Sequence, residues 1–347
     1  MSKRKKKKSW KERQRERQIK QQKAQEDYRI QREREAERKP RKWPKGKILM
    51  AVCLLVLIFG AYGAWQYTKP SAISEEPPPT SEAIYIRADG LVDPSTASIL
   101  NVGNIYYTFT DDIHDSIVIE RDHIVVDGAN HTLQGTGAYN SIGIDLSERS
   151  NVTMANIKIK DFDYGVYLYQ AYICVLSQND LTNNYCGIYL EYSSNNTLSG
   201  NNITVNDYEG ISLNWCFINS ISGNNIINNQ KGILLYESSN NAISGNSVTN
   251  NYYGIYLYDS SSDSVYHNNF VNNTQQVYDE SWYGPEVPSS TNVWDDGYPS
   301  GGNYWSDYEE WLPDAEELGG SGIWNTPYVI DENNQDNYPL ISELPPT

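Results

Sequence analysis

The sequence repeats itself between residues 143 and 276, and the period of this repeat limits the folds open to the chain. Each copy begins with a glycine that precedes an apolar-x-Leu triplet, and successive glycines are 22, 22, 23, 22 and 22 residues apart. These glycines are Gly143, Gly165, Gly187, Gly210, Gly232 and Gly254. A period this short, with polar corners, is typical of a solenoid in which each copy forms one coil.

Four positions of the copy, counted from its glycine, are apolar in all six copies: positions 2, 4, 12 and 17. Positions 2 and 4 share one face of a strand, since side chains alternate along a strand. Positions 12 and 17 follow Gly, Asn and Ser residues that favour turns, so they belong to further strands of the same coil. No helical periodicity competes with this pattern. We therefore predict an all-β chain whose repeats form the rungs of a parallel β-helix.

Position 15 is asparagine in five of the copies. These residues are Asn179, Asn201, Asn224, Asn246 and Asn268. Stacked rungs bring equivalent residues about 4.8 Å apart, so each amide can bond to its neighbours above and below. We interpret this column as a structural asparagine ladder rather than as a binding site.

The residues on either side of the regular repeats, 143–276, lack their period. Residues 83–142 contain β-like runs and predict an N-terminal cap with irregular first rungs. Residues 277–347 are rich in Trp, Gly and Pro and predict a C-terminal cap. A solenoid needs both caps, because an open end exposes unpaired strand edges.

The N-terminal part predicts a membrane anchor. Residues 1–47 hold 21 of the 28 Lys and Arg but 7 of the 44 Asp and Glu, and form a basic tail. Residues 48–66 begin with an uncharged run long enough to span a membrane as one helix, and residues 67–82 form a Pro-rich linker. The basic flank places the N-terminus in the cytoplasm and the repeats outside the cell membrane. A cleaved signal peptide is the alternative, and nothing else supports nucleic-acid binding by the tail.

The repeats and the C-terminal region together resemble a known family. Copies of the form GIYLEYSSNNTLSGNNI, at residues 187–203, resemble the NosD-type right-handed β-helix, which belongs to the pectate-lyase-like superfamily. The tail NVWDDGYPSGGNYWSDY, at 292–308, resembles the one that follows such helices in many archaeal surface proteins. The resemblance covers about residues 83–343 and implies a right-handed β-helix on the cell surface. It does not imply one activity, because this fold carries lyases, hydrolases, epimerases and non-catalytic binders.

We expect no cofactor, with a Ca²⁺ ion as the alternative. Relatives often carry an Asp/Gly-rich, Ca²⁺-suited segment in the tail, but here Asp314, Glu316 and Glu317 lack that spacing. Copper, which the resemblance names, needs His, Met or Cys. The exported part offers only scattered ligands without an HxH or MxxM pair, namely His114, His123, His131, His267, Met154, Cys174, Cys186 and Cys216. The three cysteines are expected to be buried and unpaired.

Catalysis is an alternative rather than the expectation. A lyase needs a base beside acids, and the best sequence cluster is Arg149, Lys158 and Lys160 with Asp161 and Asp163. A hydrolase needs two facing carboxylates. Its candidates on early rungs are Asp111, Asp112, Asp127, Asp161 and Asp163. The motifs of pectin-type hydrolases and of the epimerases are absent.

Outward-facing tyrosines give the most suggestive pattern. Positions 3 and 5 alternate with the buried positions, and with nearby acids they supply the candidate carbohydrate-binding residues Tyr167, Tyr169, Tyr189, Glu191, Tyr236, Glu237, Tyr256 and Tyr258. A row of tyrosines with carboxylates can stack on sugar rings and bond their hydroxyls, although tyrosine also suits exposed strands. We therefore expect a membrane-anchored, extracytoplasmic β-helix that binds or scaffolds envelope polysaccharide or glycoprotein. The alternatives are a polysaccharide lyase or glycoside hydrolase, and a purely structural spacer.

Overall fold

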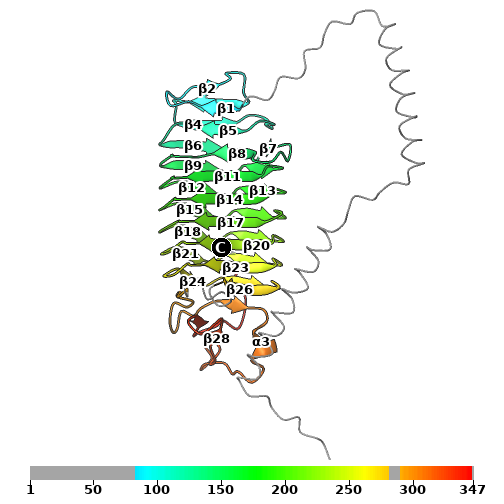
Figure 1. The fold of residues 1–347 in the computed structure, drawn as a ribbon, viewed down its shortest axis with the longest axis vertical. Helices are drawn as coiled ribbons and strands as arrows, with labels where there is room; N and C mark the ends of the chain where they lie inside the picture. The colour runs from blue at the N-terminus through cyan, green and yellow to red at the C-terminus, as the bar shows by residue number, and fades with distance from the viewer. Residues whose placement is uncertain (1–82, 281–289, 346–347) are drawn as a thin grey trace, which may run out of the picture. The chain divides into compact units, whose positions relative to one another are not determined.

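A computed structural model describes residues 83–280 and 290–345. Most strands in these residues form three large sheets, parallel apart from one antiparallel pair at the N-terminal end of two of them, and the rungs stack on one another (Figure 1). The prediction of an all-β, right-handed parallel β-helix is confirmed. The basic tail and the helix expected at residues 48–66 lie outside the described residues. Within the described ranges, no helix is long and apolar enough to cross a membrane.

Each rung contributes one strand to each sheet, in the order sheet A, sheet B, sheet C, and the chain then returns to sheet A. Sheet A contains β2 (Val92–Asp93), β1 (Ile84–Ile86), β5 (Ile117–Ile119), β8 (Ile142–Asp145), β11 (Tyr164–Tyr169), β14 (Cys186–Glu191), β17 (Glu209–Asn214), β20 (Lys231–Tyr236), β23 (Tyr253–Tyr258) and β26 (Gln275–Asp279). Sheet B contains β24 (Ser264–Tyr266), β21 (Ala242–Ser244), β18 (Ser220–Ser222), β15 (Thr197–Ser199), β12 (Val175–Ser177), β9 (Val152–Ala155), β6 (Ile124–Asp127), β4 (Tyr106–Phe109) and β3 (Ile99–Val102). Sheet C contains β27 (Tyr304–Trp305), β25 (Asn269–Val271), β22 (Ser247–Thr249), β19 (Asn225–Ile227), β16 (Asn202–Thr204), β13 (Asp180–Thr182), β10 (Lys158–Lys160) and β7 (Thr132–Gln134).

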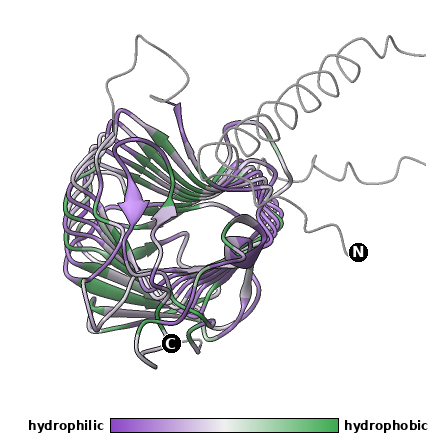
Figure 2. Ribbon diagram, turned by 90° about the horizontal axis from the view of Figure 1, so that it is seen from below, coloured by the Kyte–Doolittle hydropathy of each residue, from purple (hydrophilic) through white to green (hydrophobic). Residues whose placement is uncertain are grey.

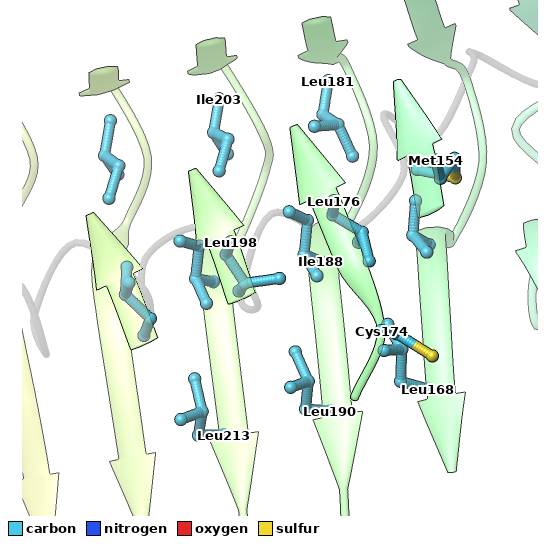
Figure 3. Close-up of a cluster of buried hydrophobic side chains, with 14 of the residues drawn as sticks. Met154, Leu168, Cys174, Leu176, Leu181, Ile188, Leu190, Leu198, Ile203 and Leu213 are labelled. Carbon is cyan, nitrogen blue, oxygen red and sulfur yellow. The ribbon is translucent and has the colours of Figure 1, made fainter. Parts of the chain in front are cut away.

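The core is built from the apolar columns that the repeat predicts. Positions 2 and 4 lie on sheet A and pair with their equivalents in the next rung, as Val166 does with Ile188 and Leu168 with Leu190. Position 12 lies on sheet B and position 17 on sheet C, and every side chain of the four columns is buried. Figure 3 shows these side chains stacked inside the coil, and Figure 2 shows the three sheets around the axis. Burying an aliphatic side chain contributes about 1.5–3 kcal/mol, so the columns stabilise the stack.

The corners of the coil depend on residues in the left-handed conformation. Positions 6, 9, 14 and 19 have positive φ throughout the regular rungs, as at Tyr192 (φ 50°), Asn195 (56°), Gly200 (63°) and Val205 (57°). Glycine and asparagine adopt this conformation readily, which explains their abundance in the sequence. The glycine at position 1 has a different role. A Cβ on Gly232 would lie 2.6 Å from the carbonyl oxygen of Gly254 in the next rung.

Asparagine ladders run along three corners, and the sequence predicted one of them, the column at position 15. The column at position 15, Asn179 to Asn268, is buried, and the backbone N–H and Nδ2 of each residue donate to Oδ1 of the next. The same pattern holds at position 10 and at position 20. The position-10 ladder is Asn196, Asn219, Asn241, Asp263 and Asn292, and the position-20 ladder is Asn184, Asn206, Asn229, Asn251 and Asn273.

The C-terminal segment covers the last rung and continues its ladders. Asn292 and Asn303 accept from the backbone N–H groups of Asp263 and Asn268, as a further rung would. Trp305 stacks on Phe270 of β25 with ring centroids 4.6 Å apart. The short helix α3 (Tyr308–Trp311) and the antiparallel pair β28 (Tyr328–Val329) and β29 (Gln335–Asp336) complete this cap.

The cysteines lie where we expected them. All three in the described residues are free and buried. Cys174 occupies position 10 and Cys216 occupies position 7, which is serine in neighbouring rungs. Burial raises the pKa of the Cys216 thiol to about 12, so it stays protonated at neutral pH. These thiols serve as small core side chains.

Candidate functional site

The predicted carbohydrate-binding residues all lie on the outer face of sheet A or at its corner with sheet B. Tyr167 of β11 and Tyr189 of β14 pair in register, and their rings stack with centroids 5.4 Å apart. Tyr236 of β20 and Tyr258 of β23 do the same at 4.4 Å. Tyr256 lies one strand from Tyr278, with ring centroids 4.9 Å apart. The tyrosines are half-buried by one another, where the sequence predicted solvent-facing rings.

Two aromatic residues that the predicted set lacked join these pairs into a continuous row. Tyr192 and Trp215 occupy corner position 6, and their rings stack with centroids 5.1 Å apart. Tyr192 also contacts Tyr169 at 6.0 Å, and Trp215 contacts Tyr236 at 5.4 Å. The resulting aromatic ridge crosses five successive rungs and consists of Tyr169, Tyr192, Trp215, Tyr236 and Tyr258. The sequence signal for this arrangement was a pair of aromatic residues at position 6 of successive copies.

The ridge residues Tyr192 and Trp215 have backbone φ angles of 50° and 49°. Bulky side chains rarely adopt this left-handed conformation, which costs them about 1–2 kcal/mol. The corner itself is required by the fold, since Gln170, Glu237 and Asp259 adopt it in other rungs. The choice of aromatic side chains at such a corner is therefore not explained by backbone preference.

Three carboxylates are held at the same end of the sheet A strands by aromatic donors. Tyr167 donates from its hydroxyl to Glu191, at 3.1 Å. Trp215 donates from Nε1 to Glu237, at 2.7 Å, and Tyr256 donates to Glu280, at 2.5 Å. Burial, followed by the Glu191 hydrogen bond, raises the pKa of Tyr167, so this hydroxyl remains a donor at neutral pH.

A buried ion pair lies at the start of two sheet A strands, β17 and β20. Lys231 Nζ is 3.5 Å from a carboxylate oxygen of Glu209, and both side chains are nearly enclosed. The same Nζ lies 4.4 Å from the ring centroid of Tyr208 and 4.5 Å from that of Tyr256. Burial raises the pKa of Glu209 to about 6, against the opposing effect of Lys231. Lys231 was not among the residues that the sequence predicted for a site.

Several residues of the predicted catalytic clusters make contacts outside those clusters. Lys158 is exposed on β10 and forms no ion pair with another described residue. Arg149 instead pairs with Asp122, at 3.5 Å, and donates to the carbonyl of Glu120. Asp112 lies 3.5 Å from His131, with its carboxylate also bound by the N–H of Thr132. These contacts fix turns between rungs.

A groove of about 810 Å³ follows the corner between sheets B and C. Its lining consists of Gln178, Ser199, Gly200, Ser222, Gly223, Ser244, Gly245, Tyr266, His267, Ser300, Leu344 and Pro345. Serine and glycine are its commonest residues, and no carboxylate or amine lines it. The aromatic face of sheet A is therefore the stronger candidate.

Comparison with known proteins assigns the chain to a family. A family model described as "Periplasmic copper-binding protein (NosD)" matches residues 103–310. The chain belongs to the NosD family. This is a periplasmic or extracytoplasmic family, which agrees with the expected location of the β-helix outside the cytoplasm. No curated protein matches the chain.

Solved structures share the coil with this NosD-family chain. A double mutant of the periplasmic alginate epimerase AlgG is 22% identical and covers 48% of this chain, with a TM-score of 0.40. Tailspike protein 2 of bacteriophage CBA120 is 16% identical over 54% of this chain and 37% of its own, also at 0.40. The A-module of Azotobacter vinelandii mannuronan C-5 epimerase AlgE6 is 14% identical over 58% of this chain and 68% of its own, at 0.38. The chain spans 38% of the length of the AlgG double mutant.

The copper in the NosD description does not fit the described side chains. No three His, Cys, Asp or Glu residues converge anywhere in ranges 83–280 and 290–345. Met154 and the three cysteines are buried in the coil, and the imidazole of His267 is bonded to Ser300. We derive no copper chemistry from this arrangement, and the expectation of no cofactor stays a prediction.

Proposed function

We propose that this NosD-family protein is a membrane-anchored, extracytoplasmic β-helix that binds envelope glycans on the outer face of sheet A. The anchor in this proposal is the helix expected at residues 48–66. The observation that carries the proposal is the aromatic ridge, whose rings touch one another across five rungs. Rings arranged along the axis of the coil suit a long ligand that lies across several rungs. The alternatives of a lyase or hydrolase and of a structural spacer stay predictions.

The chemistry of the ridge matches glycan recognition. Aromatic faces stack on the apolar faces of sugar rings, while nearby polar groups bond the hydroxyls. Tyr192 keeps 49% of its surface exposed, so a ligand can reach its ring. Glu191 and Glu237 lie beside the ridge and supply acceptors.

A glycan array with the purified full-length protein tests this proposal. The ridge variant is Trp215→Asn, because asparagine tolerates the left-handed corner that Trp215 occupies. The matched control is Tyr172→Ser. Tyr172 is exposed and lies outside the ridge, and the equivalent residue of the next rung, Ser194, is already a serine. We expect at least one glycan to bind, at least tenfold more weakly to Trp215→Asn and unchanged to the control. Absence of any glycan ligand, or equal effects of both variants, would contradict the proposal.

A further inference from the structure

The outer face of sheet A carries a strong negative charge. Lys231 is the only lysine or arginine between residues 164 and 280. Its charge is matched by Glu209, which lies 3.5 Å away. The remaining carboxylates at the end of the sheet A strands are Glu191, Glu237, Asp259 and Glu280. An anionic glycan would meet like charges on this face, and like-charge contacts are costly at interfaces.

The face already holds one ammonium group. Lys231 Nζ lies between the rings of Tyr208 and Tyr256, at 4.4 and 4.5 Å, with Glu209 as its counter-ion. Aromatic rings attract cations through their negative faces, and carboxylates form charge-assisted hydrogen bonds with ammonium groups. The surroundings of Lys231 thus show the combination of groups that suits an ammonium ion here.

The same combination recurs along the ridge without a lysine. Glu237 is positioned by Trp215 and lies beside the stacked rings of Tyr236 and Tyr258. Glu191 is positioned by Tyr167 and ends the strand that precedes Tyr192. Each carboxylate accepts one hydrogen bond from its aromatic donor, and a carboxylate can accept several hydrogen bonds.

The three positioned carboxylates lie on alternate rungs. Glu191 ends β14, Glu237 follows β20 and Glu280 follows β26, and one strand of sheet A separates each pair. Neighbouring strands are about 4.8 Å apart, so successive carboxylates are separated by about 10 Å along the axis. A linear polymer with positive charges at regular intervals can meet several of them at once.

We infer that the sheet A face selects glycans with free amino groups, that is, polymers of amino sugars whose nitrogen is protonated rather than acetylated. This inference rests on the proposed function and names its ligand class. Sugar rings stack on the ridge residues Tyr192 and Trp215. Ammonium groups bind the carboxylates of Glu191 and Glu237. An acetylated amino sugar can still stack on the ridge but carries no positive charge. A uronate polymer carries negative charges instead.

Calorimetric titration of the full-length protein at pH 6 tests the ligand class. The probes are glucosamine oligomers, N-acetylglucosamine oligomers of the same length, and oligogalacturonates. We expect the glucosamine oligomers to bind at least tenfold more tightly than the acetylated ones, with affinity falling as salt rises. No binding of the oligogalacturonates is expected.

Two isosteric variants separate charge from shape. Glu191→Gln and Glu237→Gln together keep acceptors for Tyr167 and Trp215 but remove two charges, and should weaken glucosamine binding at least tenfold. Asp207→Asn, an exposed acid in the turn between sheets C and A, is the matched control and should change nothing. Equal or tighter binding of acetylated or acidic glycans overturns this inference and leaves the proposed function standing. Binding of no glycan at all overturns both.

Discussion

Asp263 is the one acid in the position-10 ladder, where the neighbouring rungs have asparagine. Its Oδ1 accepts from the N–H and Nδ2 of Asn241, as an asparagine oxygen would. Its Oδ2 is buried without a hydrogen-bond partner among the described residues. The equivalent Nδ2 of Asn241 donates to the carbonyl of Cys216. A proton on Oδ2 would let Asp263 donate as the amide does, so the neutral acid fits the ladder and the carboxylate does not.

Asp263→Asn is therefore expected to stabilise the β-helix increasingly as pH rises. Burial raises the pKa of Asp263 from its ordinary value near 3.8 to about 7. The stability that the raised pKa provides is present below about pH 3.8 and is lost as pH rises through 7. The difference between the free energies of unfolding of Asp263→Asn and the wild type should therefore grow, in favour of the variant, by about 2–3 kcal/mol between pH 5 and pH 8. Denaturant titrations of both proteins at these two pH values measure this. A pH-independent difference would contradict the neutral-acid interpretation.

The ladders act as elements in their own right, because each links the corners of successive rungs. Asn224 accepts from the N–H and Nδ2 of Asn201 and donates from its own Nδ2 to the carbonyl of Leu198. These groups are buried, and a buried backbone polar group without a partner costs about 1–3 kcal/mol. The ladders thus satisfy buried backbone groups at the corners.

Asn224→Ala should lower the free energy of unfolding by about 3 kcal/mol, because it leaves the amide of Asn201 and the carbonyl of Leu198 unsatisfied. Asn225→Ala is the matched control. Asn225 faces outward on β19 and makes one side-chain bond, to Asn202, so its loss should cost under about 1 kcal/mol. Denaturant unfolding followed by circular dichroism compares the two. Similar losses in both variants would mean that the ladder adds nothing to an ordinary surface bond.

The strands themselves follow from the repeat, and two of the three ladders are visible in it as columns of asparagine. Columns such as Leu190 and Leu213 were predictable, because alternation along a strand fixes which side chains point inward. The ladder at position 15 was recognised by its five asparagines. The column at position 10 is interrupted by Cys174 and Asp263. The column at position 20 is asparagine in five successive copies, as position 15 is, but was not recognised. Which backbone group each amide bonds to depends on the corner geometry, which the sequence pattern does not display.

At the scale of the whole β-helix, the C-terminal cap substitutes for a missing rung. Trp305 is central to it, stacking on Phe270 at 4.6 Å and on Tyr328 at 4.3 Å. Its Nε1 donates to Asp336, which also accepts from the N–H of Asn303. Through Trp305, the cap thereby joins Phe270 of the core to Asp336, which lies more than 60 residues further along the chain.

Trp305→Ala should destabilise the β-helix by about 3–5 kcal/mol, since it removes a buried ring and leaves a cavity at the end of the core. The effect should be greatest near the cap, because each rung of a solenoid contacts only its neighbours. Hydrogen exchange followed by mass spectrometry should show faster exchange in β22 and β25 than in the wild type, with β9 and β12 unchanged. The control Tyr298→Ala removes an exposed ring of the cap and should leave exchange unaltered. Uniform acceleration over all rungs would contradict this account.

The sequence by itself determined the coil: its period, its inward columns and the face on which Tyr167, Tyr189 and Tyr236 lie. These features are local, because glycine corners and alternating side chains act within a single rung. The tertiary structure decided which outward side chains meet. Tyr192 and Trp215 are 23 residues apart in sequence, yet their rings stack at a corner. Trp215 donates a hydrogen bond to Glu237 of the next rung. Such contacts depend on how the corners turn and how the rungs stack, which the one-dimensional pattern of the repeat leaves open.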